Sequence, residues 1–156
     1  MRLLLHHAFA NPVNHARFQL DRLKRYLVRV EEIGASALAD DDLIAFSQQA
    51  WNMRDNTRAC LRRAEFQAFD AEVDAELSLS ICSDLANLVK HGKPDRNAKV
   101  GAQLTHKHIH ASDGAHSGLA TARHTITLSD SSRHDALAVA REAVAAWEKI
   151  ISKHGL

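Results

Sequence analysis

Four polar residues that could carry chemistry lie in residues 79–92, with the sequence LSICSDLANLVKHG. On a helix, Asp84, Asn87 and His91 fall within about 60° of one another, beside the apolar face, and Lys90 is next to His91. A carboxylate beside an imidazole orients it and raises its pKa, so the histidine can serve as a general acid, a general base or a charged anchor. These four residues are candidate catalytic residues of a hydrolase or nuclease.

The same pattern has a structural interpretation. Polar groups at the border of a buried face need hydrogen-bond partners, and Asp84 could accept a hydrogen bond from His91 or from an arginine of a neighbouring helix. Such a network would hold the helix in register without any reaction. Arg54 and Asp55, on a preceding predicted helix, are further candidate site residues. Their position relative to Asp84 would distinguish an open site from a buried network.

Residues 81–92, ICSDLANLVKHG, resemble the "IC.DLAN..KH" segment of a family of small, uncharacterised helical proteins in bacterial and phage genomes. Members often carry an aromatic residue near an Asp on an upstream helix and a tryptophan in the final helix. Similar features here are Trp51, Arg54 and Asp55 in AWNMRDN and Trp147 in AAWEKII. This chain has WNMRDN where the family more often has an Asp-aromatic pair. The resemblance extends loosely over residues 43–151 and implies a small helical protein, but no reaction.

Three histidines, His106, His108 and His110, alternate in the sequence HKHIH. On a strand, alternate residues share one face, and neutral imidazoles bind zinc and other divalent transition metals. Neighbours on that face are about 6 to 7 Å apart, so three would converge on one ion only if the strand bends. The alternatives are a solvated polar face and a pH-sensitive interface, because several charged histidines would repel one another. No other cofactor is expected.

A basic stripe runs along the second predicted helix. Arg54, Arg58 and Arg62 follow one another at steps of four, with Arg63 beside them, and such a stripe could contact the phosphates of a nucleic acid. It could equally be a solvated face paired with acids such as Asp55 and Glu65. The net charge of +1 provides no overall attraction for nucleic acid, and no ladder of aromatic residues accompanies the stripe.

Other function classes lack their motifs. The chain has no GxGxxG, P-loop, GxSxG or HExxH sequence. Cys60 and Cys82 fall at apolar positions of predicted helices, where a disulfide framework and a nucleophilic role are both disfavoured. No apolar run is long enough to span a membrane, and histidines interrupt the N-terminal leucine run. We expect a soluble, cytoplasmic protein without a membrane partner.

Amphipathic helices must position these residues. Apolar residues recur at steps of three and four, and Asn11 with Pro12, the acids at 40–42 and the glycines at 34, 92 and 155 are helix start and stop signals. Residues 65–76 are expected to contain a turn between helices. The predicted elements are helices at about 12–33, 41–64, 74–91 and 131–153 and a β-hairpin at about 98–128. This predicts a mainly α, four-helix bundle-like single domain over residues 1–156, with the hairpin before the last helix.

Function is predicted less directly than fold. The absence of catalytic motifs and the abundance of amphipathic helix favour a protein that acts by binding or assembly with a protein partner, or as a homo-oligomer. The alternatives are a hydrolase or nuclease using Asp84, Asn87, Lys90 and His91, and a metal-binding protein.

Overall fold

The chain is mainly helical, with a small antiparallel sheet before the last helix, as predicted. The computed structural model describes residues 11–32, 38–91, 98–111 and 120–156. The helices are α2 (Pro12–Glu32), α3 (Leu38–Arg58), α4 (Phe66–Ala75), α5 (Leu77–His91) and α6 (Ala136–Lys153), with a 3₁₀ turn η1 (Arg63–Glu65). The strands are β1 (Gln103–Ala111), β2 (Ala120–Thr127) and β3 (Arg133–Asp135).

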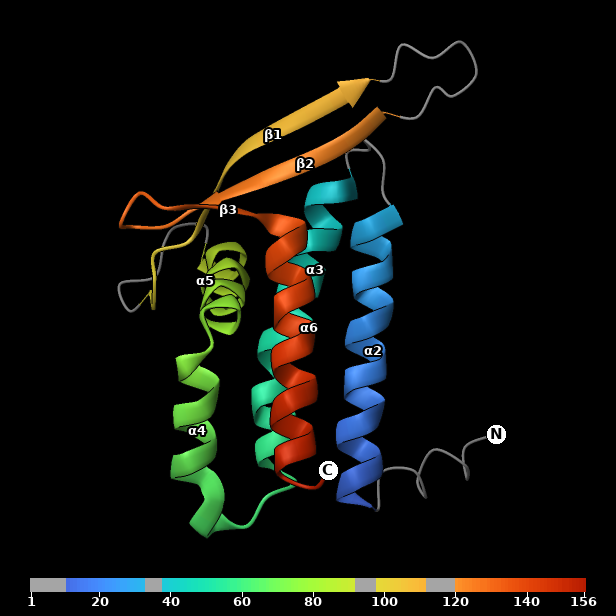
Figure 1. Ribbon diagram of the computed structural model, residues 1–156, viewed down its shortest axis with the longest axis vertical. Coiled ribbons are helices and arrows are strands. Elements are labelled where there is room, and N and C mark those ends of the chain that lie inside the picture. Colours follow the sequence, from blue (N-terminus) through green and yellow to red (C-terminus); the bar gives the residue numbers. More distant parts are fainter. Residues whose placement is uncertain (1–10, 33–37, 92–97, 112–119) are drawn as a thin grey trace.

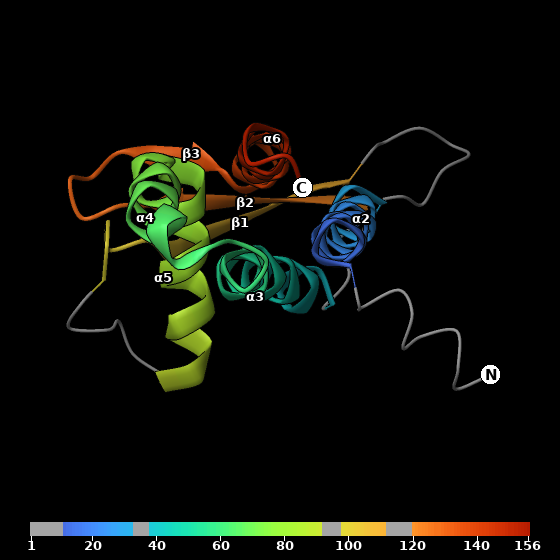
Figure 2. The ribbon, with the colours of Figure 1, turned by 90° about the horizontal axis from the view of Figure 1, so that it is seen from below.

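Four of the described helices lie along a common axis, and the fifth, α5, crosses them. Figure 1 shows α2, α3, α4 and α6 upright, with α5 seen nearly end-on. In Figure 2, turned by 90°, those four helices are seen nearly end-on and α5 is seen from the side. The hairpin formed by β1 and β2 runs across the upper end of these helices and rises away from them (Figure 1). The fourth upright helix is therefore α4, and the helix that carries Asp84 lies across the others.

The upright helices bury a core around Trp147 of α6. This side chain has no exposed surface, and its indole Nε1–H donates to the carbonyl oxygen of Ala50 on α3 at 2.9 Å. A polar ring nitrogen buried without a partner would be costly, so this bond fixes α6 against α3. Other fully buried members of this core are Leu23, Phe46, Met53, Phe69 and Val73.

A second apolar cluster attaches the sheet to the helices. Ile126 of β2 packs with Leu85 of α5 and Val139 of α6, and Ala102, just before β1, is buried in the same cluster. The hairpin residues that join this cluster in the described part of the chain, such as Leu104 and Ile126, lie near its base. The described helices hold no segment long and apolar enough to cross a membrane.

The second helix ends earlier than predicted. The sequence favoured a helix to residue 64, but α3 stops at Arg58 and residues 59–62 form a turn. The Glu65 carboxylate accepts the backbone N–H of Arg62 at 3.0 Å, which caps the new start. Residues 65–76 contain a break between helices at Glu76, as expected, but most of the stretch is the separate helix α4, so the described chain has five α-helices rather than four.

The last helix begins later than predicted. Its N-cap is Asp135, whose carboxylate accepts the Ala138 N–H at 3.0 Å, and β3 precedes it. Asp130 instead accepts the Ser132 N–H at 2.8 Å in a tight turn where Ser131 has φ 69°. The capping residues expected at 130–132 therefore stabilise the turn between β2 and β3.

Helix α5 is buried more completely than an amphipathic pattern predicts. Residues 78–86 are all buried, whereas Leu77 at the start of the helix is 47% exposed. Because α5 crosses the other helices, it has neighbours on several sides (Figure 2). The small serines at 78, 80 and 83 are buried as well, although polar residues usually lie on the solvent face of an amphipathic helix.

Candidate functional site

The carboxylate of Asp84 holds the chain segment that leads into β1. Asp84 is 6% exposed, and its Oδ1 accepts the backbone N–H of Lys99 at 2.8 Å. Its Oδ2 accepts the N–H groups of Val100 at 2.9 Å and Ala102 at 3.2 Å. We call Asp84 together with residues 99–102 the Asp84 clasp. Three backbone donors converge on one carboxylate, as in anion-binding backbone nests.

Gly101 allows the backbone to turn so that these three N–H groups point at the same carboxylate. Its φ of +65° lies in the left-handed region, and a Cβ there would sit 2.9 Å from the Cβ of Ser129. Ser129 also donates its backbone N–H and its hydroxyl to the carbonyl oxygen of Val100, at 3.0 and 3.1 Å. The clasp is thus held from the helix side by Asp84 and from the sheet side by Ser129.

Lys99 connects the clasp to a charged network on α3 and α4. While its N–H binds Asp84, its ammonium pairs with the carboxylate of Asp74 and lies 4.5 Å from the centre of the Trp51 ring. Arg54 also faces Trp51, with its guanidinium carbon 5.2 Å from the ring centre. Trp51, one of the residues named above for the family resemblance, therefore lies against two cations.

Arg54 is engaged by acids. Its Nε donates to Asp70 Oδ1 at 3.1 Å and its Nη1 lies 3.8 Å from Asp74 Oδ1, while Arg58 reaches Asp70 Oδ2 at 3.4 Å. Arg62 pairs with Glu65 at 3.0 Å. Arg62 lies beyond the end of α3, so the predicted stripe does not continue along one helix, and its three arginines are each paired with an acid.

The candidate site residues whose side chains the structure describes come from α3 and α5. Contacts link Asp84 to Lys99, Lys99 to Asp74 and Asp74 to Arg54, while Asp55 is exposed. Asn87 is half-buried on α5. The side chains of Lys90 and His91 fall outside the described residues, although the backbone places both at the end of α5.

This geometry gives Asp84 a structural role. Both carboxylate oxygens are occupied by backbone donors in a buried setting, which is the arrangement expected of a locked network and not of an accessible base. The donors found are main-chain groups of residues 99–102, whereas the side chain of His91, one of the partners that the sequence suggested, lies outside the described residues. Catalysis by the cluster stays a prediction.

The hairpin histidines occupy alternate positions of β1. In the register with β2, His106 is opposite Thr125, His108 opposite Arg123 and His110 opposite Thr121. Their side chains lie outside the described residues, so metal binding by them stays a prediction. Within the described part of the chain, no group of three or more His, Cys, Asp or Glu side chains is arranged to hold a metal ion.

The cysteines are unpaired thiols among buried or half-buried side chains. Burial raises the pKa of Cys82 to about 12, against a smaller opposing effect from a hydrogen bond with Ser47, and burial also raises the pKa of Cys60. A thiol with a raised pKa holds little thiolate at neutral pH and is a poor nucleophile.

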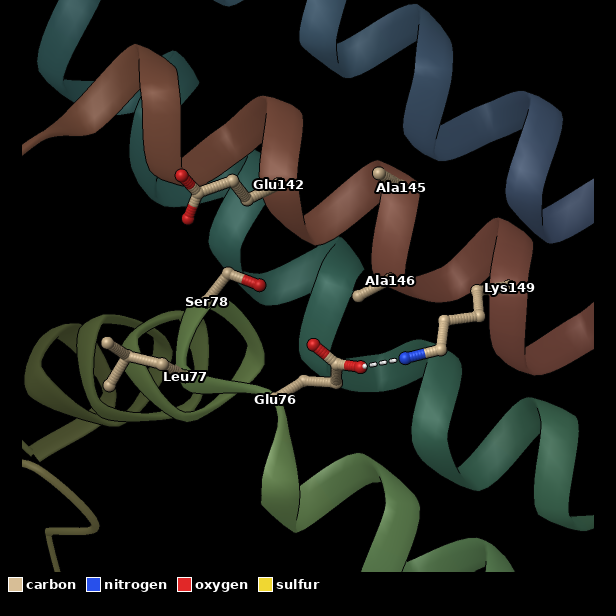
Figure 3. Close-up of a pocket in the computed structure, with 7 residues that line it drawn as sticks. All are labelled: Glu76, Leu77, Ser78, Glu142, Ala145, Ala146 and Lys149. Carbon is tan, nitrogen blue, oxygen red and sulfur yellow. Dashed lines mark hydrogen bonds and ion pairs between the residues drawn. The ribbon is translucent and has the colours of Figure 1, made fainter.

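A surface hollow of about 360 Å³ lies where α4, α5 and α6 meet (Figure 3). Glu76 and Ser78 come from the α4–α5 corner, and Glu142 and Lys149 project from α6, with Glu76 and Lys149 paired at 3.1 Å. Its other lining residues are Leu77, Ala145 and Ala146. The lining contains neither an imidazole nor a thiol, so the hollow offers contact surface rather than a nucleophile and its base.

Sequence reasoning missed Lys99, Asp70 and Asp74 as members of this region. Gly101 was a visible signal of a tight turn, but helix periodicity cannot indicate that a carboxylate will bind a backbone group 15 residues later. Comparison with known proteins adds no assignment: no protein-family model, curated protein or solved structure significantly matches the chain. The family resemblance of residues 81–92 stays a prediction.

Proposed function

We propose that this protein acts by assembly, and that the open edge of β1 pairs with β1 of a second copy of the chain. The observation that carries the proposal is the strand order β1-β2-β3, in which β1 lies at the edge of the sheet among the strands that the structure describes. An edge strand presents unpaired backbone N–H and C=O groups that another strand can bind.

The length of β1 favours pairing along this edge. Its nine residues extend about 30 Å at the usual strand rise, and eight of them pair with β2. The ninth, Thr105, is bypassed by a shift in register between Leu104 and His106. Beyond its base the hairpin rises away from the described helices (Figure 1), so none of these helices runs along the distal edge of β1.

A second copy is the occupant that this edge suits. Two β1 strands related by a twofold axis have equal lengths and the same pattern of unpaired groups, so each satisfies the other without a further component. The alternating histidines of β1 would then lie on adjoining strands. Their protonation in acid would oppose association through charge repulsion.

Light scattering coupled to size-exclusion chromatography tests the proposal. We expect a dimer at neutral pH and dissociation at about pH 5.5, below the ordinary histidine pKa. At a protein concentration of about 0.2 mM, even a weak dimer with a Kd well below about 1 mM is populated. A protein that remains monomeric at neutral pH up to this concentration would overturn the proposal.

Proline substitutions locate the interface. Of two adjacent strand residues, one N–H faces the paired strand and the other faces the open edge, so Lys107→Pro and His108→Pro form a matched pair. One variant should lose association while retaining the unfolding temperature of the wild type, and the other should weaken the hairpin itself. Association that survives in both variants would place the contact elsewhere.

A further inference from the structure

A second hollow, of about 310 Å³, lies on α2 and is lined by Arg22, Arg25, Tyr26 and Arg29. Three of its four lining residues carry a permanent positive charge, because an arginine side chain is not deprotonated in proteins. We call these four residues the α2 arginine hollow. It is separate from the hairpin edge and from the Asp84 clasp.

Helical spacing gathers these side chains on one face of α2, with Tyr26 at its edge, half-buried against the helical core. Positions 22, 25, 26 and 29 are separated by three and four residues, which places them side by side along one face. Ala16, Leu20 and Leu23, on the opposite face, are buried in the helical core. All three arginines are exposed, so their charge faces solvent.

Tyr26 and Asp42 hold two of the arginines in place. The guanidinium carbons of Arg22 and Arg29 lie 5.9 and 5.5 Å from the centre of the Tyr26 ring. Arg29 Nη2 also lies 2.6 Å from Oδ1 of Asp42, a buried carboxylate, while the Arg29 side chain remains 59% exposed. Ordering an arginine before a ligand arrives reduces the entropy lost on binding.

Charge in the hollow is less neutralised than charge on α3. Arg29 pairs with Asp42, but no acid of the described chain pairs with Arg22 or Arg25. By contrast, Arg54 and Arg58 of α3 both contact acids of α4. Elsewhere on α2, the Lys24 cation pairs with Glu148 and the Glu31 carboxylate with Arg141.

We propose that the α2 arginine hollow binds the phosphate groups of an anionic ligand. Guanidinium groups present several N–H donors in a planar fork that matches phosphate oxygens, and charge-assisted bonds of this kind are among the stronger ones in water. The volume is about ten times that of one water molecule, enough for more than one phosphate group. Tyr26 is faced by guanidinium groups, so the hollow recognises the phosphates and not a stacked base.

Isothermal titration with sodium tripolyphosphate and with a short oligothymidylate tests the proposal. Binding of tripolyphosphate alone identifies a compact polyphosphate as the ligand type, and binding of the oligonucleotide alone identifies a nucleic-acid backbone. The Arg22→Gln/Arg25→Gln variant should bind about ten- to a hundredfold more weakly, as expected for lost hydrogen bonds to charged groups. Added salt should weaken the wild-type interaction.

The matched control is Arg17→Gln/Arg63→Gln, which removes the same charge from two exposed arginines outside the hollow. It should bind like the wild type. No heat of binding with either ligand at millimolar concentration would overturn the proposal, and so would equal weakening in the two double variants. Unchanged unfolding temperatures would show that both variants remain folded, since all four substituted residues are exposed.

Discussion

Asp84 and Asp70 are carboxylates of the same type that join elements in different ways. Asp84 is buried and accepts three backbone N–H groups, so it fixes the path of the main chain. Asp70 is 24% exposed and pairs with the long side chains of Arg54 and Arg58. A carboxylate that holds main-chain donors away from water should contribute far more to stability than one that holds flexible cations at the surface.

The largest expected effect is that of Asp84→Ala. Removing the carboxylate leaves three buried or half-buried N–H donors without a partner, and we expect a loss of about 3 to 5 kcal/mol in the free energy of unfolding. Urea denaturation measures this loss. Asp55→Ala, which truncates an exposed aspartate of α3, is the control and should change stability little. A loss below about 1 kcal/mol for Asp84→Ala would contradict the expectation that Asp84 contributes far more to stability than Asp70.

Gly101→Ala should come next, at about 2 to 3 kcal/mol, because it adds both an unfavourable positive φ and a clash with Ser129. Gly155→Ala separates the two causes, since Gly155 has φ +69° with nothing within 4 Å of an added Cβ. It should cost only about 1 kcal/mol. Equal losses in thermal or urea unfolding would mean that the contact with Ser129 is unimportant.

The Arg54 and Asp70 pair should contribute about 1 kcal/mol or less. A double-mutant cycle with Arg54→Met and Asp70→Asn measures the coupling energy. That coupling should fall in 1 M salt, where screening is strong, whereas the cost of Asp84→Ala should not. A salt-independent coupling above about 2 kcal/mol would place Asp70 in the same class as Asp84.

The smallest expected effect on stability is that of Glu72 on α4, which pairs with Lys153 and His154 near the C-terminus. A hydrogen bond from Lys153, and then one from His154, hold the pKa of Glu72 below its ordinary 4.5. Because the folded pKa is lowered, the stabilisation is present above that ordinary value and is lost as the pH falls through the folded pKa. Glu72→Gln should therefore flatten the fall in unfolding temperature between about pH 5 and pH 3. An unchanged acid limb would show that other carboxylates cause the fall.

Elements with regular apolar spacing could be predicted from the sequence. Helix α2 was expected at 12–33 and is found at Pro12–Glu32, because its leucines form one uninterrupted stripe. Helix α4 was missed because only Phe69 and Val73 are buried in it. Its acids, Asp70 and Asp74, are matched by cations of α3 and by Lys99, and such partners become visible only in the folded chain.

The sequence indicated that Asp84 lies next to the buried face of its helix, but it did not indicate the backbone groups that Asp84 binds. Helical spacing placed Asp84 at the border of the buried face, and it is buried there. Its partners are backbone groups, which carry no sequence signature beyond the glycine at 101. The crossing of α5 over the other helices also escaped prediction, since periodicity describes a helix but not its direction in the fold.

The two tryptophans give the molecule intrinsic reporters for its two kinds of contact. Trp147 is wholly buried with its ring nitrogen bonded to a carbonyl, so its fluorescence should be blue-shifted until the core itself unfolds. Trp51 lies half-buried between Arg54 and Lys99, and its emission should respond to changes in the charged network while the core stays intact. Emission spectra of Trp51→Phe and Trp147→Phe would separate loosening of the surface network from global unfolding.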